Sequence, residues 1–186
     1  MNLKEQIENY IPFNEQEEVD KEYFLKFLDS FDDVLTRENW FGHFTASAFV
    51  VNKEKTKMLC VYQIINDGWM YPGGHADGES NLLSVAIREV EEETGVKPKV
   101  LDDKIFSIQS GAVNGHIKRG KYVPAHIHFD VMYIMEADEN EILSFRQDES
   151  KGVKWIRFED ATNDEIVDFI RPIHKKLIEK LKVTNL

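Results

Sequence analysis

The stretch that most constrains how this chain can fold is YPGGHADGESNLLSVAIREVEEETGV, from Tyr71 to Val96. It begins with a turn rich in glycine and continues into a segment with helical periodicity. One face of the predicted helix is apolar and would anchor it to a core: Leu83, Ala86, Ile87, Val90 and Thr94. Gly95 follows the last periodic residue, where a helix end favours left-handed backbone geometry. The sequence therefore predicts a helix over about residues 81–94.

Three glutamates of this predicted helix, Glu89, Glu92 and Glu93, would be neighbours, because residues three and four apart share a face. Like charges this close repel each other unless a cation neutralises them. Mg2+ prefers oxygen ligands and typically takes one or two carboxylates together with substrate phosphates. Arg88 lies four residues before Glu92, at the spacing of a helical ion pair. The pattern indicates a metal site, and the alternative is a solvated acidic face.

The same stretch carries a longer pattern of fixed residues. Gly74 is followed, at set distances, by Arg88-Glu89-Val90-x-Glu92-Glu93-x-Gly95-Val96. This resembles the Nudix box, G-x5-E-x7-R-E-U-x-E-E-x-G-U, in which U is a bulky aliphatic residue. The one fixed position that differs is the early glutamate of the box, where this chain has Ser80, preceded by Glu79. We expect the difference to affect the turn, with Glu79 filling the same space or Ser80 serving as the helix N-cap.

The resemblance implies an α+β fold, an α/β/α sandwich with a mixed sheet between helices, and a hydrolase activity. The implied reaction is metal-dependent cleavage of a diphosphate bond in a nucleoside diphosphate linked to another moiety, with Mg2+ or Mn2+ as cofactor. It implies Glu89, Glu92 and Glu93 as metal ligands, with Arg88 orienting them; Glu92, Glu93 and Arg88 would be catalytic. A non-catalytic nucleotide-sensing domain and an isoprenoid-diphosphate isomerase of the same fold are alternatives. The isomerase would need a catalytic cysteine, and Cys60 lies in a predicted strand far from the box.

Candidates for substrate binding lie around the glycine turn and later in the chain: Gly73, Gly74, His75, Trp69, Tyr71, His126, His128 and Arg119. The two glycines would let the backbone approach phosphates closely, because glycine has no Cβ. The two aromatic residues would stack on a nucleobase or pack in the core. Arg119 belongs to the basic segment 116–121, which would meet phosphate oxygens or form a solvated hairpin tip.

His126, His128 and Asp130 alternate along a predicted strand and therefore share one face. The order H-x-H-x-D is similar to the metal-binding start of the metallo-β-lactamase-like hydrolases, and imidazole is a common zinc ligand. That family continues with a histidine directly after the aspartate, but Val131 stands there in this chain. We therefore favour a polar face that lines the substrate cleft, with the zinc hydrolase and hydrogen-bonded histidines as alternatives.

Glu149 lies six residues before Trp155, in an acidic loop that precedes a predicted strand. Some Nudix hydrolases carry an extra glutamate in a similar place, as general base or additional metal ligand, so the resemblance implies a catalytic role for Glu149. Asp148 competes for this role, and an ordinary exposed loop is the further alternative. A base must come within hydrogen-bond reach of the attacking water.

Composition limits the classes of partner. The chain has 186 residues, 42% of them hydrophobic and 31% charged, as expected for one globular domain. The net charge of −11 argues against a nucleic-acid polymer, so we expect a small-molecule nucleotide diphosphate as substrate. We expect no membrane partner, because the chain lacks a long apolar run and an apolar leader. Cys60 is the single cysteine, so we expect a cytoplasmic location. We expect a monomer or a homodimer.

The order of predicted elements divides the chain in two. Residues 1–38 would form an N-terminal helical extension that packs on the main domain, with helices at Leu3–Tyr10 and Lys21–Phe31. Residues 39–186 would form the Nudix hydrolase domain, which begins with an alternating strand from Gly42. Its last helix is expected to run from about Thr162 to Val183.

Overall fold

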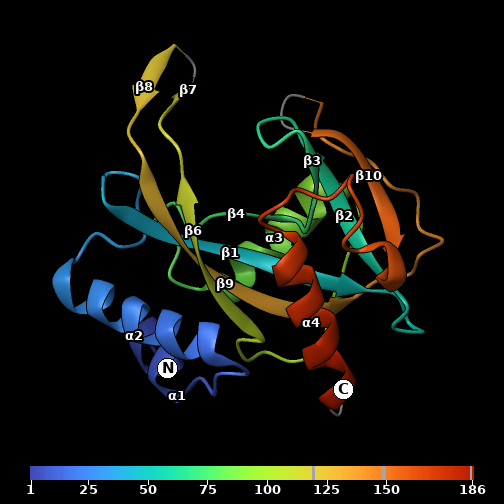
Figure 1. Ribbon diagram of the computed structural model, residues 1–186, viewed down its shortest axis with the longest axis horizontal. Helices are drawn as coiled ribbons and strands as arrows, with labels where there is room; N and C mark the ends of the chain where they lie inside the picture. Colours follow the sequence, from blue (N-terminus) through green and yellow to red (C-terminus); the bar gives the residue numbers. More distant parts are fainter. Residues whose placement is uncertain (119, 148–149, 185) are drawn as a thin grey trace.

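Two long parallel strands, β1 and β9, form the centre of a mixed sheet in the computed structural model, which describes residues 1–118, 120–147, 150–184 and 186 (Figure 1). The helices are α1 (Leu3–Asn9), α2 (Glu15–Ser30), α3 (Leu82–Thr94) and α4 (Arg171–Val183), with a 3-10 turn at Phe158–Asp160. The strands are β1 (Gly42–Val51), β2 (Lys57–Gln63), β3 (Gly68–Met70), β4 (Gly73–His75), β5 (Lys99–Val100), β6 (Ser107–Val113), β7 (His116–Lys118), β8 (Lys121–Val123), β9 (His126–Glu136) and β10 (Ser150–Arg157).

The main sheet has the order β10-β2-β1-β9-β5, and three further strands pair with it at the sides. β3 pairs with β2, the short β4 pairs with β1, and β6 pairs with β9, all antiparallel. β7 and β8 form a separate hairpin that projects from the sheet (Figure 1). The helices α3 and α4 lie on opposite sides of the sheet, as expected for an α+β sandwich (Figure 1).

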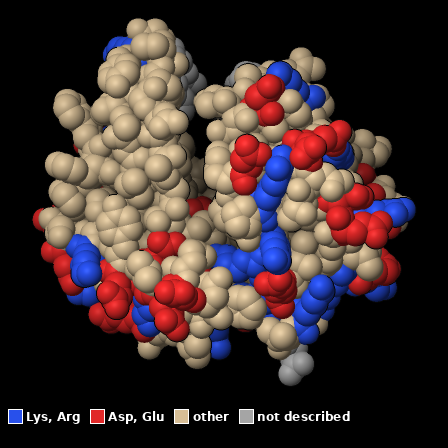
Figure 2. Space-filling model, in the orientation of Figure 1, with Lys and Arg blue, Asp and Glu red and all other residues tan. Residues whose placement is uncertain are grey.

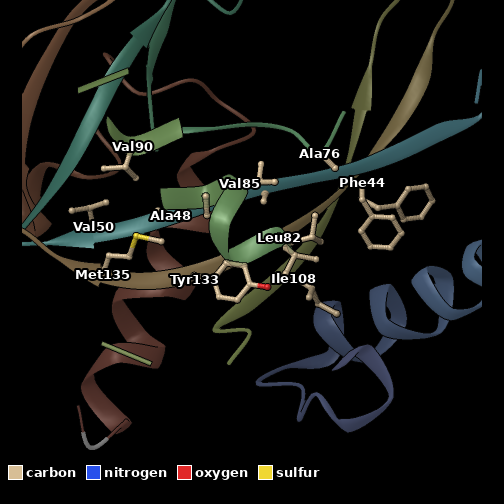
Figure 3. Close-up of a cluster of buried hydrophobic side chains, with 14 of the residues drawn as sticks. Phe44, Ala48, Val50, Ala76, Leu82, Val85, Val90, Ile108, Tyr133 and Met135 are labelled. Carbon is tan, nitrogen blue, oxygen red and sulfur yellow. The ribbon is translucent and has the colours of Figure 1, made fainter. Parts of the chain in front are cut away.

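One face of β1 and β9 is entirely apolar. Phe44, Ala48, Tyr133 and Met135 belong to it, and they pack with Leu82, Val85 and Val90 of α3 (Figure 3). The fully buried positions of the helix are thus shifted from the expected set, because Leu83 and Ile87 are only partly buried. Both sets satisfy helical spacing, so periodicity alone could not choose between them.

The opposite face of β1 and β9 changes character along the strands. Its first positions are polar, with His43, Thr45 and Ser47 on β1 and His128 and Asp130 on β9. Its later positions are apolar: Phe49, Val51, Met132 and Ile134 pack with Ile170, Leu177, Ile178 and Leu181 in and before α4. Helix α4 therefore covers the apolar end of this face, and its apolar residues do not pack against the polar end.

The N-terminal helices are joined to the rest of the chain through the buried carboxylate of Glu17 in α2. It forms ion pairs with Lys176 and Lys180 of α4 at 3.0 and 3.2 Å. It also accepts hydrogen bonds from the hydroxyls of Tyr10 and Ser107. Because these groups belong to α2, the preceding loop, β6 and α4, Glu17 connects the first helices to both the sheet and the last helix.

Two helices start at other residues than the sequence predicts, and the structure decides which residue caps a third. Helix α2 begins at Glu15 instead of Lys21, because the side chain of Asn14 caps it by accepting from the N–H of Glu17 at 3.0 Å. Helix α4 begins at Arg171, which places Pro172 in its first turn, where a missing N–H costs no helical hydrogen bond. The N-cap of α3 is Asn81, whose side chain accepts from the N–H of Ser84, so Ser80 does not cap the helix.

No helix among residues 1–118, 120–147 and 150–184 is long and apolar enough to cross a membrane.

Candidate active site

The box helix α3 is fixed at both of its ends. Asn81 caps the first turn, and the carboxylate of Glu79 accepts a 2.8 Å hydrogen bond from the N–H of Asn81. Glu79 therefore supports the start of the helix in the region where the Nudix pattern expects its early glutamate. At the other end Gly95 adopts φ 76°, a left-handed conformation that glycine accepts readily. The carboxylates of the helix are thus presented by a rigid element.

Glu93 faces inward and holds the glycine turn. Only 4% of the residue is exposed. Its carboxylate accepts one hydrogen bond of 2.9 Å from the N–H of Gly73 and another of 2.8 Å from the side-chain amide of Gln63. An ionised carboxylate has about four lone-pair positions, so these two bonds leave capacity for a cation. Glu93 thus couples α3 to β4 and β2.

The two glycines of the turn are required by packing on opposite sides of β4. A Cβ on Gly74 would lie 2.7 Å from Oε1 of Glu89 and still closer to the rest of that carboxyl group. A Cβ on Gly73 would lie 2.6 Å from the Cβ of Ser47 in β1. Gly74 therefore leaves room for the carboxylate of Glu89, and Gly73 allows β4 to pair closely with β1.

Glu92 is the outward-facing carboxylate of the helix. Its side chain is 44% exposed, compared with 17% for that of Glu89. Arg88 contacts both, with Nη2 at 3.1 Å from Oε1 of Glu89 and Nε at 3.9 Å from Oε1 of Glu92. Arg146, in the loop before β10, approaches Oε2 of Glu92 at 3.4 Å. Two guanidinium groups therefore orient the outer carboxylates.

The three carboxylates of the box offer the type of donor atom that a hard divalent cation takes. They lie at different depths, with Glu93 buried, Glu89 partly buried and Glu92 exposed. All the donor atoms are carboxylate oxygens, which Mg2+ and Mn2+ accept. The space that Gly74 leaves open is filled by the carboxyl group of Glu89, which therefore lies directly against the glycine turn.

The two aromatic candidates have different environments. Tyr71 is buried with the apolar residues around α4, and its ring lies 6.0 Å from that of His174. Trp69 is partly exposed: Lys154 Nζ lies 4.3 Å from the centre of its ring, and Tyr62 packs edge-on at 5.2 Å. Of the pair, Trp69 alone has a partly accessible ring, although Lys154 covers one side of it.

Asp130 belongs to a buried hydrogen-bond network. Its carboxylate accepts from Thr45 Oγ1 at 2.9 Å, from Ser47 Oγ at 2.6 Å and from the side-chain amide of Gln109. Burial raises the pKa of Asp130, although these donors act in the opposite direction. Its oxygens are occupied by protein donors, which argues against the ligand set that H-x-H-x-D would form in a zinc hydrolase.

His126 and His128 lie in a cluster of imidazoles at the polar end of the β1–β9 face. Their Nε2 atoms are 3.2 Å apart, and His43 packs against both, with ring centres at 4.9 and 5.0 Å. His75 lies 5.1 Å from His43 and 4.9 Å from His128 between ring centres. Sequence reasoning missed His43, although its alternation with Thr45 and Ser47 had marked the polar face of the strand.

Burial dominates the electrostatics of this histidine cluster. It lowers the pKa of His43 to about 4, and the neighbouring His126 contributes in the same direction. It lowers the pKa of His128 to about 2, with further contributions from His75, His43 and His126. His43 and His128 are therefore neutral at neutral pH.

Four of the residues considered in the sequence analysis contribute no observed contact to the candidate site. Arg119, Asp148 and Glu149 lie outside the described residues. Cys60 is fully buried in β2, and burial raises the pKa of its thiol, which does not suit the catalytic cysteine that an isomerase would need.

The comparisons with known proteins agree with this geometry. The NUDIX domain model matches residues 42–181. An RNA pyrophosphohydrolase of Pelagibacter ubique is 31% identical over 139 residues, which cover 72% of this chain and 87% of that protein. A diphosphoinositol polyphosphate phosphohydrolase 2 of Mus musculus is 28% identical over 159 residues, or 86% of this chain and 80% of that protein.

A solved structure is similar in fold. The crystal structure of a NUDIX-family hydrolase from Clostridium perfringens matches with a TM-score of 0.54 and 24% identity, over 75% of this chain and 97% of the other. The predicted α+β sandwich is thereby confirmed. From the family model, the relatives and the fold together, the chain belongs to the Nudix hydrolase family.

Proposed function

We propose that this Nudix hydrolase cleaves a diphosphate bond in a nucleoside diphosphate linked to another moiety, with Mg2+ or Mn2+ as its cofactor. The observation that carries the proposal is the position of the box carboxylates. Glu93 binds the N–H of Gly73, and Glu89 fills the space left by Gly74. This arrangement brings the acidic face of α3 against the backbone of the glycine turn, where a phosphate chain bridged by a cation would fit.

Each residue of the site has a distinct task in this proposal. Glu89 and Glu92 would hold the cation through carboxylate oxygens, and Glu93 would contribute an oxygen while it fixes the turn. Arg88 keeps the two outer carboxylates oriented, because it contacts both. The bound cation would stabilise negative charge on the phosphoryl oxygens and lower the pKa of the attacking water. The protein would supply positioning, which accounts for much of the rate of phosphoryl transfer.

A groove in the surface would give the substrate access. Figure 2 shows it between the projecting β7–β8 arm and the part of the molecule that contains β2, β3 and β10. Trp69 of β3, with its partly exposed ring, would contact the nucleobase, and His75, His126 and His128 would line the polar side of the site. Gly73 and Gly74, which have no Cβ, would let the phosphates approach the backbone of the turn, and Arg119, outside the described residues, stays a candidate phosphate contact.

The charge of the chain bears on which phosphate compound it accepts. With a net charge of −11, the protein repels highly charged anions at long range, which favours a substrate with few phosphates. The names of the relatives favour two other substrates, an RNA and a diphosphoinositol polyphosphate. Both carry more negative charge than a nucleoside diphosphate conjugate, so a substrate panel separates the candidates.

The test is a panel assay with the full chain. Nucleoside diphosphate conjugates, 5′-triphosphorylated RNA, diphosphoinositol polyphosphates and an isoprenoid diphosphate are incubated with Mg2+, with Mn2+, or after exhaustive EDTA treatment. We expect hydrolysis of at least one nucleoside diphosphate conjugate, lost with EDTA and restored by Mg2+ or Mn2+.

Glu92→Gln should abolish most of this turnover, whereas Glu91→Gln, on the exposed side of the same helix at a variable position of the box, should not. Undiminished hydrolysis in EDTA contradicts the metal requirement. Isomerisation without hydrolysis supports the isomerase alternative, and binding without turnover supports a sensing domain.

A further inference from the structure

Three strands of the sheet bring three histidines to one point. His43 comes from β1, His75 from β4 and His128 from β9, and each offers a ring nitrogen that lies within 4.8 Å of the nitrogens of the other two. The strand pairing explains the convergence, because β1 pairs His43 with His128, and Thr45, two residues further on, with His75. Among the described residues, only this group brings three potential metal-ligand atoms of His, Cys, Asp or Glu within 4.8 Å of one another.

His43 is the most unusual member of this histidine trio (His43, His75 and His128). The residue is 4% exposed, and neither of its buried ring nitrogens has a hydrogen bond of good geometry, although the nearby backbone of Asn39 acts to raise its pKa. Leaving a polar group buried without a partner is costly, so such groups normally acquire a protein, water or metal partner.

We infer that the histidine trio is a binding site for a borderline divalent transition-metal ion of the zinc class, separate from the carboxylate site on α3. Imidazole nitrogen suits Zn2+, Ni2+ and Cu2+, whereas Mg2+ and Ca2+ prefer oxygen. Three protein ligands with an open fourth position are also an arrangement that zinc uses with three histidines.

The geometry requires only a small contraction. Nitrogens bound tetrahedrally to one zinc ion at about 2.0–2.1 Å lie ~3.4 Å from each other. The nitrogens of the trio lie at most 4.8 Å apart, so small side-chain rotations would complete the site. Such rotations leave the three strands in place, because the trio is attached to one continuous hydrogen-bonded sheet.

His126 orients one ligand of the site. Its Nδ1 lies 2.9 Å from the carbonyl oxygen of Pro124, which can only accept, so Nδ1 of His126 carries the proton. Nε2 of a neutral His126 then accepts from Nε2–H of His128 at 3.2 Å. This leaves the lone pair of a neutral His128 on Nδ1, the atom through which it would bind the ion. His126 therefore acts as the outer partner that metal-bound histidines usually have.

The two cation sites lie on opposite sides of β4. The missing Cβ of Gly74 faces the carboxylate of Glu89, and the next residue, His75, faces the polar side of the sheet with Thr45. The trio can therefore be loaded with the carboxylates intact, and each site can be removed separately.

The test is direct metal binding by the metal-free full chain in a large excess of Mg2+, which occupies oxygen sites. Zn2+ binding is measured by calorimetry, and Co2+ is used as a spectroscopic probe whose visible absorption reports nitrogen ligands and low coordination number. The wild type is compared with His75→Gln and His128→Gln, which avoid the fully buried His43. His116→Gln, a histidine outside the trio, and Glu92→Gln are the controls, and circular dichroism verifies the fold of every variant.

We expect one Zn2+ per chain and a Co2+ spectrum typical of imidazole ligands. Both trio variants should weaken Zn2+ binding by more than ~100-fold, beyond the ~10–100-fold loss that removal of an outer partner causes. The two controls should bind as the wild type does. Zn2+ binding that is unchanged in the trio variants, or lost in Glu92→Gln alone, overturns the inference. Mg2+-dependent hydrolysis tests the proposed function independently.

Discussion

The carboxylate of Glu93 accepts a 2.9 Å hydrogen bond from the backbone N–H of Gly73, twenty residues earlier in the chain. This bond joins the last turn of the box helix to the glycine turn that precedes the helix. Gln63 of β2 donates to the other oxygen of the same carboxylate at 2.8 Å. One buried side chain therefore fixes the relative positions of the helix, the turn and a sheet strand.

Glu92→Gln and Glu93→Gln should lower turnover through different routes. Glu92 is exposed, so its substitution should change stability by no more than ~0.5 kcal/mol while the rate falls by ~10²–10³, by analogy with the loss of a charge-stabilising group. Glu93→Gln also replaces one acceptor oxygen by an amide donor facing Gly73 or Gln63. It should therefore cost an additional ~1–3 kcal/mol in the free energy of unfolding.

Urea unfolding and turnover, measured on both variants, distinguish the two routes, with Glu91→Gln as the control on the same helix. Equal stability of the Glu92 and Glu93 variants would show that Glu93 does not anchor the turn.

Gly74→Ala should disturb the carboxylate of Glu89 without unfolding the chain. The added Cβ meets the far end of a flexible side chain, which can move away. A displacement of about 1 Å at a reacting site can cost ~10²-fold in rate, so we expect a loss of that order.

Gly111→Ala makes the same exchange where the added Cβ meets nothing within 4 Å, and it should retain the metal affinity of the wild type. Mg2+ affinity and turnover of both variants are the measurements. A Gly74 variant with wild-type values would mean that Glu89 tolerates the displacement and is not a ligand.

Glu17→Gln should strongly destabilise the packing of the N-terminal helices. The substitution leaves the ammonium groups of Lys176 and Lys180 near an uncharged side chain in a buried position. Removal of one partner from a buried ion pair typically costs about 3–5 kcal/mol. The matched control is Asp29→Asn, which breaks the exposed Lys4–Asp29 pair and should leave the free energy of unfolding almost unchanged.

Guanidinium unfolding measures both variants, and proteolysis of residues 1–38 reports whether these helices detach. An effect of Glu17→Gln as small as that of Asp29→Asn would contradict our proposal that these residues pack as an integral extension on the domain of residues 39–186.

The pH dependence of stability gives a second readout of Glu17. Burial alone would raise its pKa, but Lys176, the Tyr10 hydroxyl, Lys180 and the N–H of Phe13 together lower it from 4.5 to about 2. A depressed pKa means that the contribution is fully present above about pH 4.5 and is lost as the pH falls toward 2. The difference in unfolding free energy between wild type and Glu17→Gln should therefore be constant from pH 7 to 5 and shrink below pH 4.5.

The box helix could be predicted from the sequence because the signals that define it are local. Its apolar periodicity and Gly95 lie within one stretch of chain, and Gly74 and the glutamates follow at fixed spacing. The sequence alone does not decide the N-cap of the helix, because Ser80 and Asn81 are adjacent and both residue types suit that position. Only the hydrogen bond from the N–H of Ser84 to Asn81 decides between them.

The histidine trio could not be predicted, because it depends on strand pairing between distant parts of the chain. His126 and His128 were visible as an alternating pair, but His43 joins His128 through the parallel pairing of β1 with β9. Parallel pairing leaves no turn signal in the sequence, in contrast to a hairpin. The same holds for Glu17, which lies between the two predicted N-terminal helices in the sequence and is buried in α2 against two lysines of α4.

The last prediction concerns Glu149, which lies outside the described residues; Arg146 before it contacts the box helix directly, and Ser150 after it is linked to the helix through Gln63. Arg146 contacts Glu92 at 3.4 Å, and Ser150 pairs with Gln63, whose side chain donates to Glu93. Because Arg146 and Ser150 have these contacts, we keep the prediction that Glu149, which lies between them in the sequence, is a general base or an additional metal ligand.

If Glu149 is the base, Glu149→Gln should lower turnover by ~10²–10⁴ and leave the Mg2+ affinity nearly unchanged, because the substitution removes proton acceptance and retains the size of the side chain. If it is a metal ligand, higher Mg2+ or Mn2+ concentrations should partly restore the rate. Turnover measured against metal concentration separates the two roles, with Asp148→Asn as the neighbouring comparison. A curve identical to that of the wild type would remove Glu149 from the site, and a loss confined to Asp148→Asn would assign the role to Asp148.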